Sequence, residues 1–222
     1  MAPMNPEERL IMSGENLPLP LPVTVTGGKA DCLTEIFRDE VNLVVWERRL
    51  PGECTEFAQA FALEAGAYER FVGIEPDDSL DQILPAWALE LPGARAWLAD
   101  VQQVVEMYLC LFEPAAVGVR LHVLADTMCP RFHTDRVPAR LLVTYAGRGT
   151  EWLPEPVVTR ADTPGPLPEQ LVSEPDIQVM ATGAVALLKG EAWVGNEGRG
   201  LVHRSPAPGA SPRLVLGLDW LS

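Results

Sequence analysis

Two spacings of apolar residues divide the chain at about residue 116. Before that point, apolar positions recur every three or four residues over 53–67 and, most regularly, over 93–112. This spacing gives a helix one continuous apolar stripe, so it predicts two packed helices. We also expect a short helix over 31–39, which Asp31 can cap, and a buried strand over 41–46.

After Pro114, apolar residues alternate with polar ones, which is typical of half-buried β-strands. Strands are predicted over 117–125, 139–145, 177–180, 184–189, 201–204 and 213–220. In the last of these, alternate leucines should pack beneath the helices. The opposite face carries Arg213 and Gly217, a cation and a position without a side chain. That face suits a barrel interior that holds a small anionic ligand.

Helices followed by short strands indicate an α+β chain with an antiparallel sheet or barrel. Residues 1–30 are Pro-rich and predict an extended arm. We expect a single domain over 31–222, with a mainly helical layer over 31–116 and a β-barrel over 117–222. The segment 147–176 contains six prolines and predicts a long loop that acts as a lid.

The composition excludes several classes of function. Of the 222 residues, 47% are apolar, which is enough for a substantial core. The net charge of −14 argues against nucleic acid as a partner, because phosphate binding needs clustered Lys and Arg. No apolar run approaches the roughly 18–20 residues of a membrane span. The first 16 residues lack an apolar signal-peptide region, and the four cysteines are scattered. We therefore expect free thiols and a cytoplasmic protein, while the oligomeric state stays open.

The candidate chemistry lies in His133, Asp135 and the distant His203. Two imidazoles and one carboxylate on one face of a metal, with the other positions open, form a mononuclear iron site. In a strand, His133 and Asp135 would point to the same side, with Cα atoms roughly 6–7 Å apart. His203 would arrive on another strand. The alternatives are a surface pair at 133 and 135 and a core histidine at 203.

Cys129 raises the alternative of zinc. A Cys/His/Asp/His set would favour that ion, because thiolate is one of its preferred ligands. In a straight strand, Cys129 would lie ~13 Å from His133, too far to share a metal. Pro130 can bend the chain and shorten that distance.

Other residues are predicted to support the ligands or to line the pocket. Arg140 and Arg204 compete with Arg213 as anion binders, although Arg204 would face away from His203 in a regular strand. His122 is expected to have a structural role or to lie behind the ligands. The remaining candidates are Tyr145, Glu151, Trp152 and Asn196.

His133, Asp135 and His203, with Arg213 ten residues further on, resemble the Fe(II)/2-oxoglutarate-dependent oxygenases. The resemblance covers about residues 117–222 and implies a double-stranded β-helix, a jelly-roll or cupin-like barrel. It also implies that the two histidines and the aspartate hold Fe(II) and that Arg213 pairs with the far carboxylate of 2-oxoglutarate. A planar guanidinium can make two parallel charge-assisted hydrogen bonds to a carboxylate.

Two longer stretches carry a more specific signal: C-P-R-F-H-T-D-R-V-P-A-R-L-L-V-T-Y from Cys129 and L-L-K-G-E-A-W-x-G-N-E-G-R-G-L-V-H-R-S-P from Leu187. They resemble a bacterial family, DUF1826. The likeness extends over most of the chain from about residue 35. The family is similar to proteins encoded beside zinc-homeostasis GTPases, which implies a link to metal supply.

Two functions follow as hypotheses. The first is a non-haem Fe(II)/2-oxoglutarate-dependent dioxygenase that hydroxylates a small molecule or a protein side chain. The alternative is a non-catalytic, cupin-like metal-binding protein that holds zinc and acts in zinc homeostasis. The oxygenase needs Arg213, or another cation, facing the metal, whereas the zinc protein does not. A third hypothesis is an inactive scaffold that keeps the fold without the metal.

Overall fold

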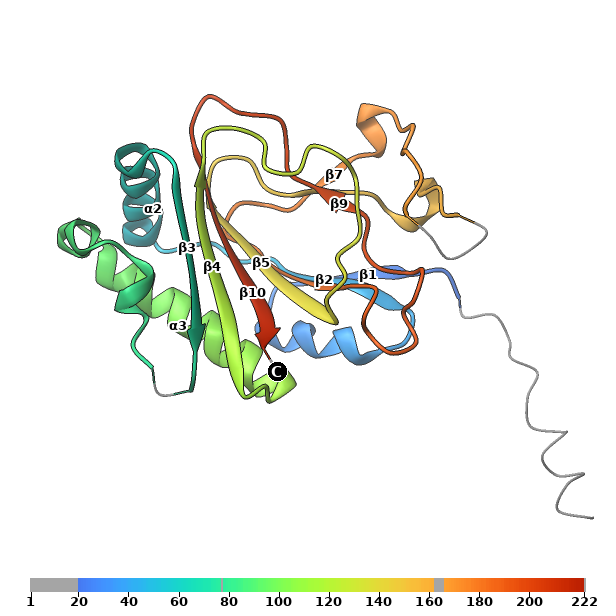
Figure 1. Ribbon diagram of the computed structural model, residues 1–222, viewed down its shortest axis with the longest axis horizontal. Helices are drawn as coiled ribbons and strands as arrows, with labels where there is room; N and C mark the ends of the chain where they lie inside the picture. The colour runs from blue at the N-terminus through green and yellow to red at the C-terminus, as the bar shows by residue number, and fades with distance from the viewer. Residues whose placement is uncertain (1–19, 77, 162–165, 222) are drawn as a thin grey trace, which may run out of the picture.

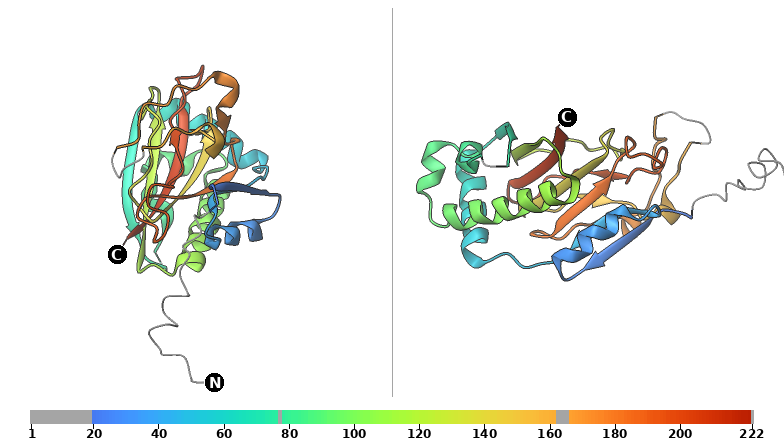
Figure 2. Two further views of the ribbon diagram at one scale, coloured as in Figure 1. Left: turned by 90° about the vertical axis from the view of Figure 1, so that its right-hand side faces the viewer. Right: turned by 90° about the horizontal axis from the view of Figure 1, so that it is seen from below.

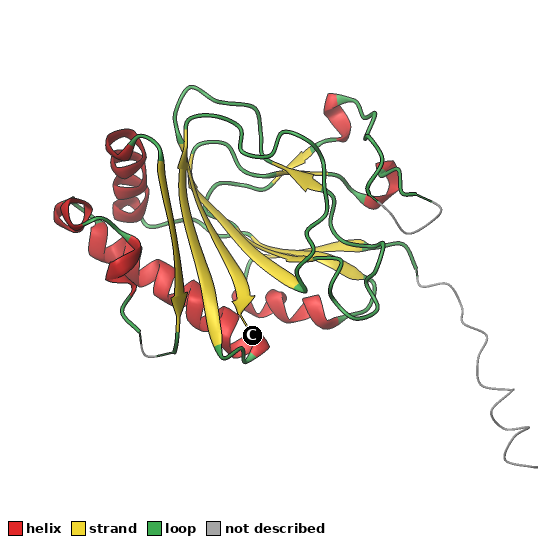
Figure 3. Cartoon of the chain, in the orientation of Figure 1, coloured by secondary structure: helices red, strands yellow, loops and turns green. Residues whose placement is uncertain are grey.

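The computed structural model describes residues 20–76, 78–161 and 166–221. Its main feature is a seven-stranded mixed sheet in the order β1-β2-β8-β5-β10-β4-β3 (Figures 1 and 3). These strands are β1 (Val23–Gly27), β2 (Val41–Trp46), β3 (Tyr68–Ile74), β4 (Ala116–Leu124), β5 (Ala139–Ala146), β8 (Val185–Lys189) and β10 (Arg213–Leu221). β1 runs parallel to β2, and the other neighbouring strands are antiparallel.

A second, three-stranded sheet lies above one part of the large sheet (Figure 1). Its order is β7-β6-β9, with β6 (Glu151–Trp152), β7 (Gln178–Val179) and β9 (His203–Arg204). Short 3₁₀ turns η4 (Glu155–Val157) and η5 (Glu174–Asp176) lie in the connection from β6 to β7. The chain is therefore α+β, with two sheets of unequal size.

The longer helices cover one face of the large sheet. They are α2 (Gly52–Ala65) and α3 (Ala94–Phe112), accompanied by the 3₁₀ helices η1 (Ala30–Phe37), η2 (Leu80–Ile83) and η3 (Ala86–Glu90). Figure 2 (right) shows α3 running across this face. The apolar stripes of both helices are buried against alternate residues of the strands, such as Leu216 and Leu218. The predicted position of the β10 leucines beneath the helices is thus confirmed.

The opposite face of the sheet is covered unevenly. A second, smaller core joins Leu43, Ala186 and Leu188 of the large sheet to Met180 and Leu201 near the small sheet. The buried members of that core on the large sheet all belong to the β2–β8 end or to the residue just before β8. The small sheet therefore seals this end, and the inner surface of β10 and β4 lines a cavity instead.

Most elements appear where the sequence predicts them, but three strands were not predicted: the edge strands β1 and β3 of the large sheet, and β6, which lies in the predicted loop 147–176. β3 is an edge strand whose Phe71 is half exposed, so its residues do not alternate cleanly between apolar and polar. β1 lies within the predicted arm, where Val23–Gly27 pairs with β2; residues 1–19 of that arm lie outside the described residues. The N-terminal part is consequently mixed, because it supplies strands as well as helices.

All four cysteines are free thiols, as predicted. Within the described residues, no helix has the length and apolar character needed to cross a membrane.

Candidate metal centre

A backbone bridge sets two histidines side by side. The N–H groups of His133 and His203 each donate to the other residue's carbonyl oxygen, both at 3.0 Å. His203 also faces Trp152 across the β6–β9 pair, so the small sheet holds it from the other side. The centres of the two imidazole rings lie 4.5 Å apart. Residues 70 positions apart in the sequence thus present their rings to a common point.

Asp135 completes the group. Its Oδ1 lies 3.9 Å from Nε2 of His133, and its Oδ2 lies 3.6 Å from Nε2 of His203. One potential ligand atom from each of the three residues lies within 4.8 Å of the others. Residues 133–135 do not form the regular strand that the sequence suggested. The convergence instead comes from the bridge to His203 and from a turn that follows it.

Gly190 fixes the backbone at Asp135, a role that the sequence analysis missed. The Glu191 N–H donates to the Asp135 carbonyl at 2.8 Å, and the Gly190 N–H donates to Pro138 at 2.9 Å. A Cβ atom at Gly190 would lie only 2.1 Å from the Val137 carbonyl oxygen. Only glycine allows this approach. A glycine directly after the buried strand β8 was the available signal.

The hydrogen bonds leave the metal-binding atoms free. Nδ1 of His133 contacts the Arg131 carbonyl at 3.0 Å, and Nδ1 of His203 contacts the Leu201 carbonyl at 3.1 Å. A carbonyl oxygen can only accept, so each Nδ1 carries the proton and each Nε2 keeps its lone pair. Oδ1 of Asp135 accepts from Arg140 at 2.9 Å, whereas the buried Oδ2 has no hydrogen-bond partner among the described residues. An unsatisfied buried carboxylate oxygen beside two imidazole lone pairs fits a divalent cation.

Burial also favours the ligand form of His203. Removal from water lowers the pKa of its imidazole, and the charge of Asp135 opposes this shift only in part. The ring is therefore neutral near pH 7, the state in which histidine binds metals.

A cavity of about 120 Å³ opens beside the three residues. β4, β5 and β10 form its floor, with His122, Leu142, Val215 and Gly217. Four arginines line it, and no Asp or Glu among the described residues does: Arg120, Arg140, Arg204 and Arg213. Cations therefore dominate this cavity in a chain whose net charge is −14.

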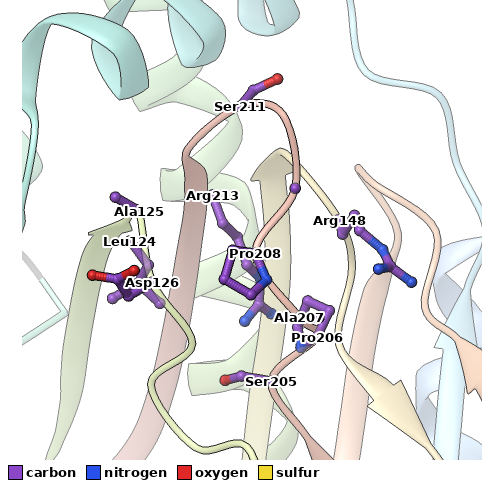
Figure 4. A pocket seen from close by; sticks show the side chains of 11 residues that line it. Leu124, Ala125, Asp126, Arg148, Ser205, Pro206, Ala207, Pro208, Ser211 and Arg213 are labelled. Carbon is purple, nitrogen blue, oxygen red and sulfur yellow. The ribbon is translucent and has the colours of Figure 1, made fainter.

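Arg213 is a buried cation with no anionic partner. Its residue is only 8% exposed, and its Nη2 donates to Thr150 at 2.6 Å and to Thr144 at 3.2 Å. It forms no ion pair within the described part of the chain, and its Nε has no partner there. Burial lowers the pKa of this guanidinium to about 10. Arg213 also lines a second cavity, of about 20 Å³, together with Ser205 and Pro208 (Figure 4). The buried charge of the Arg213 guanidinium would be stabilised by an anion that enters the site.

Comparison with known families places the chain in one of them. A family model described as a protein of unknown function (DUF1826) matches residues 27–219. The chain belongs to the DUF1826 family. A comparison with curated proteins finds no match.

Several solved structures are similar to this DUF1826 protein. A rice dioxygenase for auxin oxidation is 16% identical, with 91% of this chain and 83% of that one covered and a TM-score of 0.51. A dioxygenase for auxin oxidation from Arabidopsis thaliana, in complex with 2-oxoglutarate, is 14% identical, with 91% and 93% covered and a TM-score of 0.44. A Pseudomonas putida prolyl-4-hydroxylase is 9% identical, with 87% and 98% covered and a TM-score of 0.45. The rice structure shows a shared fold.

The other two predicted anion binders of the DUF1826 chain are already paired. Arg140 donates to Asp135 and, through Nε and Nη2, to both oxygens of Asp219. Arg204 donates to Glu151 at 2.7 Å and lies 4.3 Å from the ring centre of Phe132. Arg213 is thus distinguished from both by its lack of a carboxylate partner.

Four predicted pocket residues lie elsewhere. Tyr145 points into the helical side, where its hydroxyl donates to Asp100 at 2.7 Å. Tyr145 and Arg140 are five residues apart in β5, so their side chains point to opposite faces of the sheet, because side chains alternate along a strand. Glu151 pairs with arginines, Trp152 packs on the smaller core, and the Asn196 amide donates to Gly190. None of the four lines the cavity beside the histidines.

Three further predictions have mixed outcomes. Cys129 lines the cavity but contributes no atom to the ligand group, and His122 lines the floor. Of the described residues in the predicted lid 147–176, only Thr150 reaches this cavity. The segment 125–138 covers it instead, tied to the β9–β10 connection by the Ser205 N–H, which donates to the Cys129 carbonyl.

Proposed function

We propose that this DUF1826 protein is a non-haem Fe(II)/2-oxoglutarate-dependent oxygenase, built on a double-stranded β-helix with an N-terminal helical layer. One observation carries the proposal: the two histidines of the His-Asp-His group and a buried arginine without a carboxylate partner line the same cavity. The fold shared with the rice dioxygenase supports it.

His133, Asp135 and His203 would hold the iron. Two imidazoles and one carboxylate suit Fe(II) and leave its remaining positions open for other ligands. Bound Fe(II) and 2-oxoglutarate together supply the activation of O₂. Arg140 positions the carboxylate: it donates to Oδ1 of Asp135 and leaves Oδ2 facing His203. Asp219 holds Arg140 in turn, with Nε at 2.7 Å.

Arg213 would bind the far carboxylate of 2-oxoglutarate. Its guanidinium is already oriented by Thr144 and Thr150, so little freedom is lost when the anion binds. The low exposure of the site keeps water away from the ion pair and strengthens it. Neither threonine was a candidate from the sequence, because their roles depend on strand positions that only the fold brings together.

The zinc-binding alternative accounts for less of the site. A protein that only binds zinc gains nothing from a buried, unpaired arginine, whose desolvation is costly. Cys129 does not join the ligand group, so the thiolate that would favour zinc is missing from the described set. The link to zinc-homeostasis GTPases, the cytoplasmic location and the hydroxylated substrate stay predictions.

The test is the conversion of 2-oxoglutarate to succinate by purified protein with Fe(II), O₂ and ascorbate. We expect slow, iron-dependent succinate formation without added substrate, and its loss in Asp135→Asn. Arg95→Gln, a surface change near Asp81, is the matched control. Tight stoichiometric zinc, no succinate and no effect of 2-oxoglutarate on metal binding would contradict the proposal.

A further inference from the structure

We infer that the substrate of this site is a small carboxylic acid, and that Arg120 binds its carboxylate while its apolar part lies over Gly217. The inference rests on the proposed function and names the substrate class for it. It draws on three features of the open half of the sheet: a row of side chains, a pre-oriented arginine and a surplus of positive charge.

The row runs across neighbouring strands. Leu142 of β5 faces Gly217 of β10, Gly217 faces Arg120 of β4, and Arg120 faces Phe71 of β3. The first three line the cavity. With strands about 4.8 Å apart, Arg120 lies roughly 10 Å across the sheet from Leu142. The row therefore leads from the cavity floor toward the outer edge of the sheet.

Gly217 leaves the middle of this row open. A Cβ atom there would lie 3.6 Å from Leu142 and 3.8 Å from Arg120, which are ordinary contact distances. The glycine is thus not required by backbone crowding, and its φ is not in the left-handed region. Its visible effect is to keep space above the sheet beside Val215 and Leu142, which form an apolar surface.

Arg120 is held in place but remains accessible. Its Nε donates to Oδ2 of Asp219 at 2.7 Å, and its guanidinium carbon lies 4.6 Å from the ring centre of Phe71. A Cβ atom at Gly118 would come within 3.0 Å of the Phe71 ring, so this glycine makes room for the ring. The Arg120 side chain is nevertheless 43% exposed. A guanidinium fixed on one edge and one face offers its other donors to a planar carboxylate.

The charges leave Arg120 without a full partner. Three of the four arginines that line the cavity, Arg120, Arg140 and Arg204, share three carboxylates, Asp135, Asp219 and Glu151. The fourth, Arg213, forms no ion pair within the described part of the chain. A divalent metal and dianionic 2-oxoglutarate cancel each other, so one positive charge remains in the loaded site. Both arginines on Asp219 share that single carboxylate, and Arg120 is the more exposed of the two. A monoanionic substrate neutralises this surplus.

The experiment uses the full chain loaded with Mn(II), which replaces Fe(II) without turnover, and saturating 2-oxoglutarate. Benzoate, phenylacetate and hexanoate are the probes, each compared with its neutral primary amide. Paramagnetic relaxation of probe protons by Mn(II) reports binding close to the metal. We expect relaxation by each acid to exceed that of its amide, and Arg120→Gln to weaken acid binding at least tenfold. Gly217→Val should also weaken it, because the new side chain fills the row.

Arg70→Gln is the matched control. Arg70 neighbours Phe71 in β3 but pairs with Leu121, on the helical side of the sheet, so acid binding should not change. Relaxation of the 2-oxoglutarate protons is recorded in every sample. If 2-oxoglutarate binds but no acid exceeds its amide, or Arg120→Gln binds the acids like the wild type, the inference is wrong and the proposed function stands. If 2-oxoglutarate itself is not relaxed by Mn(II), the proposed function fails, and the inference with it.

Discussion

Replacing Arg213 with methionine should stabilise the metal-free protein while abolishing 2-oxoglutarate binding. The side chain lies in the cavity wall at 8% exposure, with two threonine hydroxyls as its hydrogen-bond partners. Methionine has a similar length and no charge, so it can occupy the same space without a desolvation cost. The two effects have opposite signs because the arginine serves the ligand and not the fold.

The magnitude follows from the pKa. Burial lowers the pKa of Arg213 from its ordinary value to about 10, and one pKa unit corresponds to 1.36 kcal/mol, so the folded state is destabilised by about 3 kcal/mol. Arginine is charged in both folded and unfolded chains at pH 7, so this cost is fully present there and declines only above pH 10. Losing two hydrogen bonds costs about 1 kcal/mol each. We therefore expect a net gain of about 1 kcal/mol in the free energy of unfolding.

Urea denaturation, with and without Mn(II) and 2-oxoglutarate, measures both effects. A ligand at 100 times its Kd should stabilise the wild type by about 2.7 kcal/mol, and the variant should show no such increase. Arg95→Met is the control, because the Arg95 side chain is 70% exposed and should change stability by less than about 0.5 kcal/mol. A variant that is clearly less stable than wild type, or that is still stabilised by 2-oxoglutarate, would refute the reasoning.

Three further changes test the rest of the site. Asp135→Asn should weaken Mn(II) binding more than about 100-fold in calorimetry, because it removes a charged ligand; retention of wild-type affinity would exclude the carboxylate. Burial lowers the pKa of His122, so the unfolded chain binds this proton first as the pH falls below 6.5, and the free energy of unfolding should decrease. His122→Gln should make the free energy of unfolding depend less on pH in this range, and an unchanged pH dependence would contradict the reasoning. Gly190→Ala should cost about 2 kcal/mol or more in urea denaturation and weaken Mn(II) binding, whereas Gly52→Ala, with open space around it, should do neither; equal effects would contradict the role assigned to Gly190.

The sequence predicts the strongly patterned elements well. The regular stripe over α3 and the alternation over β4 reflect stronger burial on one side than on the other, and the sequence records this difference directly. β3 was missed because it is an edge strand that carries the large apolar side chain of Phe71 on an exposed face, so its apolar and polar residues do not alternate with burial.

In the candidate site, too, the sequence identifies some residues and the fold is needed to identify the others. His133, Asp135, His203 and Arg213 could be named because their residue types and spacing have a chemical meaning. Thr144, Thr150 and Gly190 could not, because their importance comes from contacts across strands far apart in the sequence. Tyr145 was named as a possible pocket residue but lies on the helical side of the sheet, as counting alternate positions from Arg140 would have indicated.

The central claim is that one cavity binds Fe(II) through two histidines and an aspartate, and 2-oxoglutarate through Arg213. Anaerobic titration of the purified protein with Fe(II), followed by visible absorption spectroscopy, tests it most directly. The account predicts a weak visible band that appears only when Fe(II) and 2-oxoglutarate are both present, and that is absent from Arg213→Met. No band with both present, or an equal band in that variant, would contradict it.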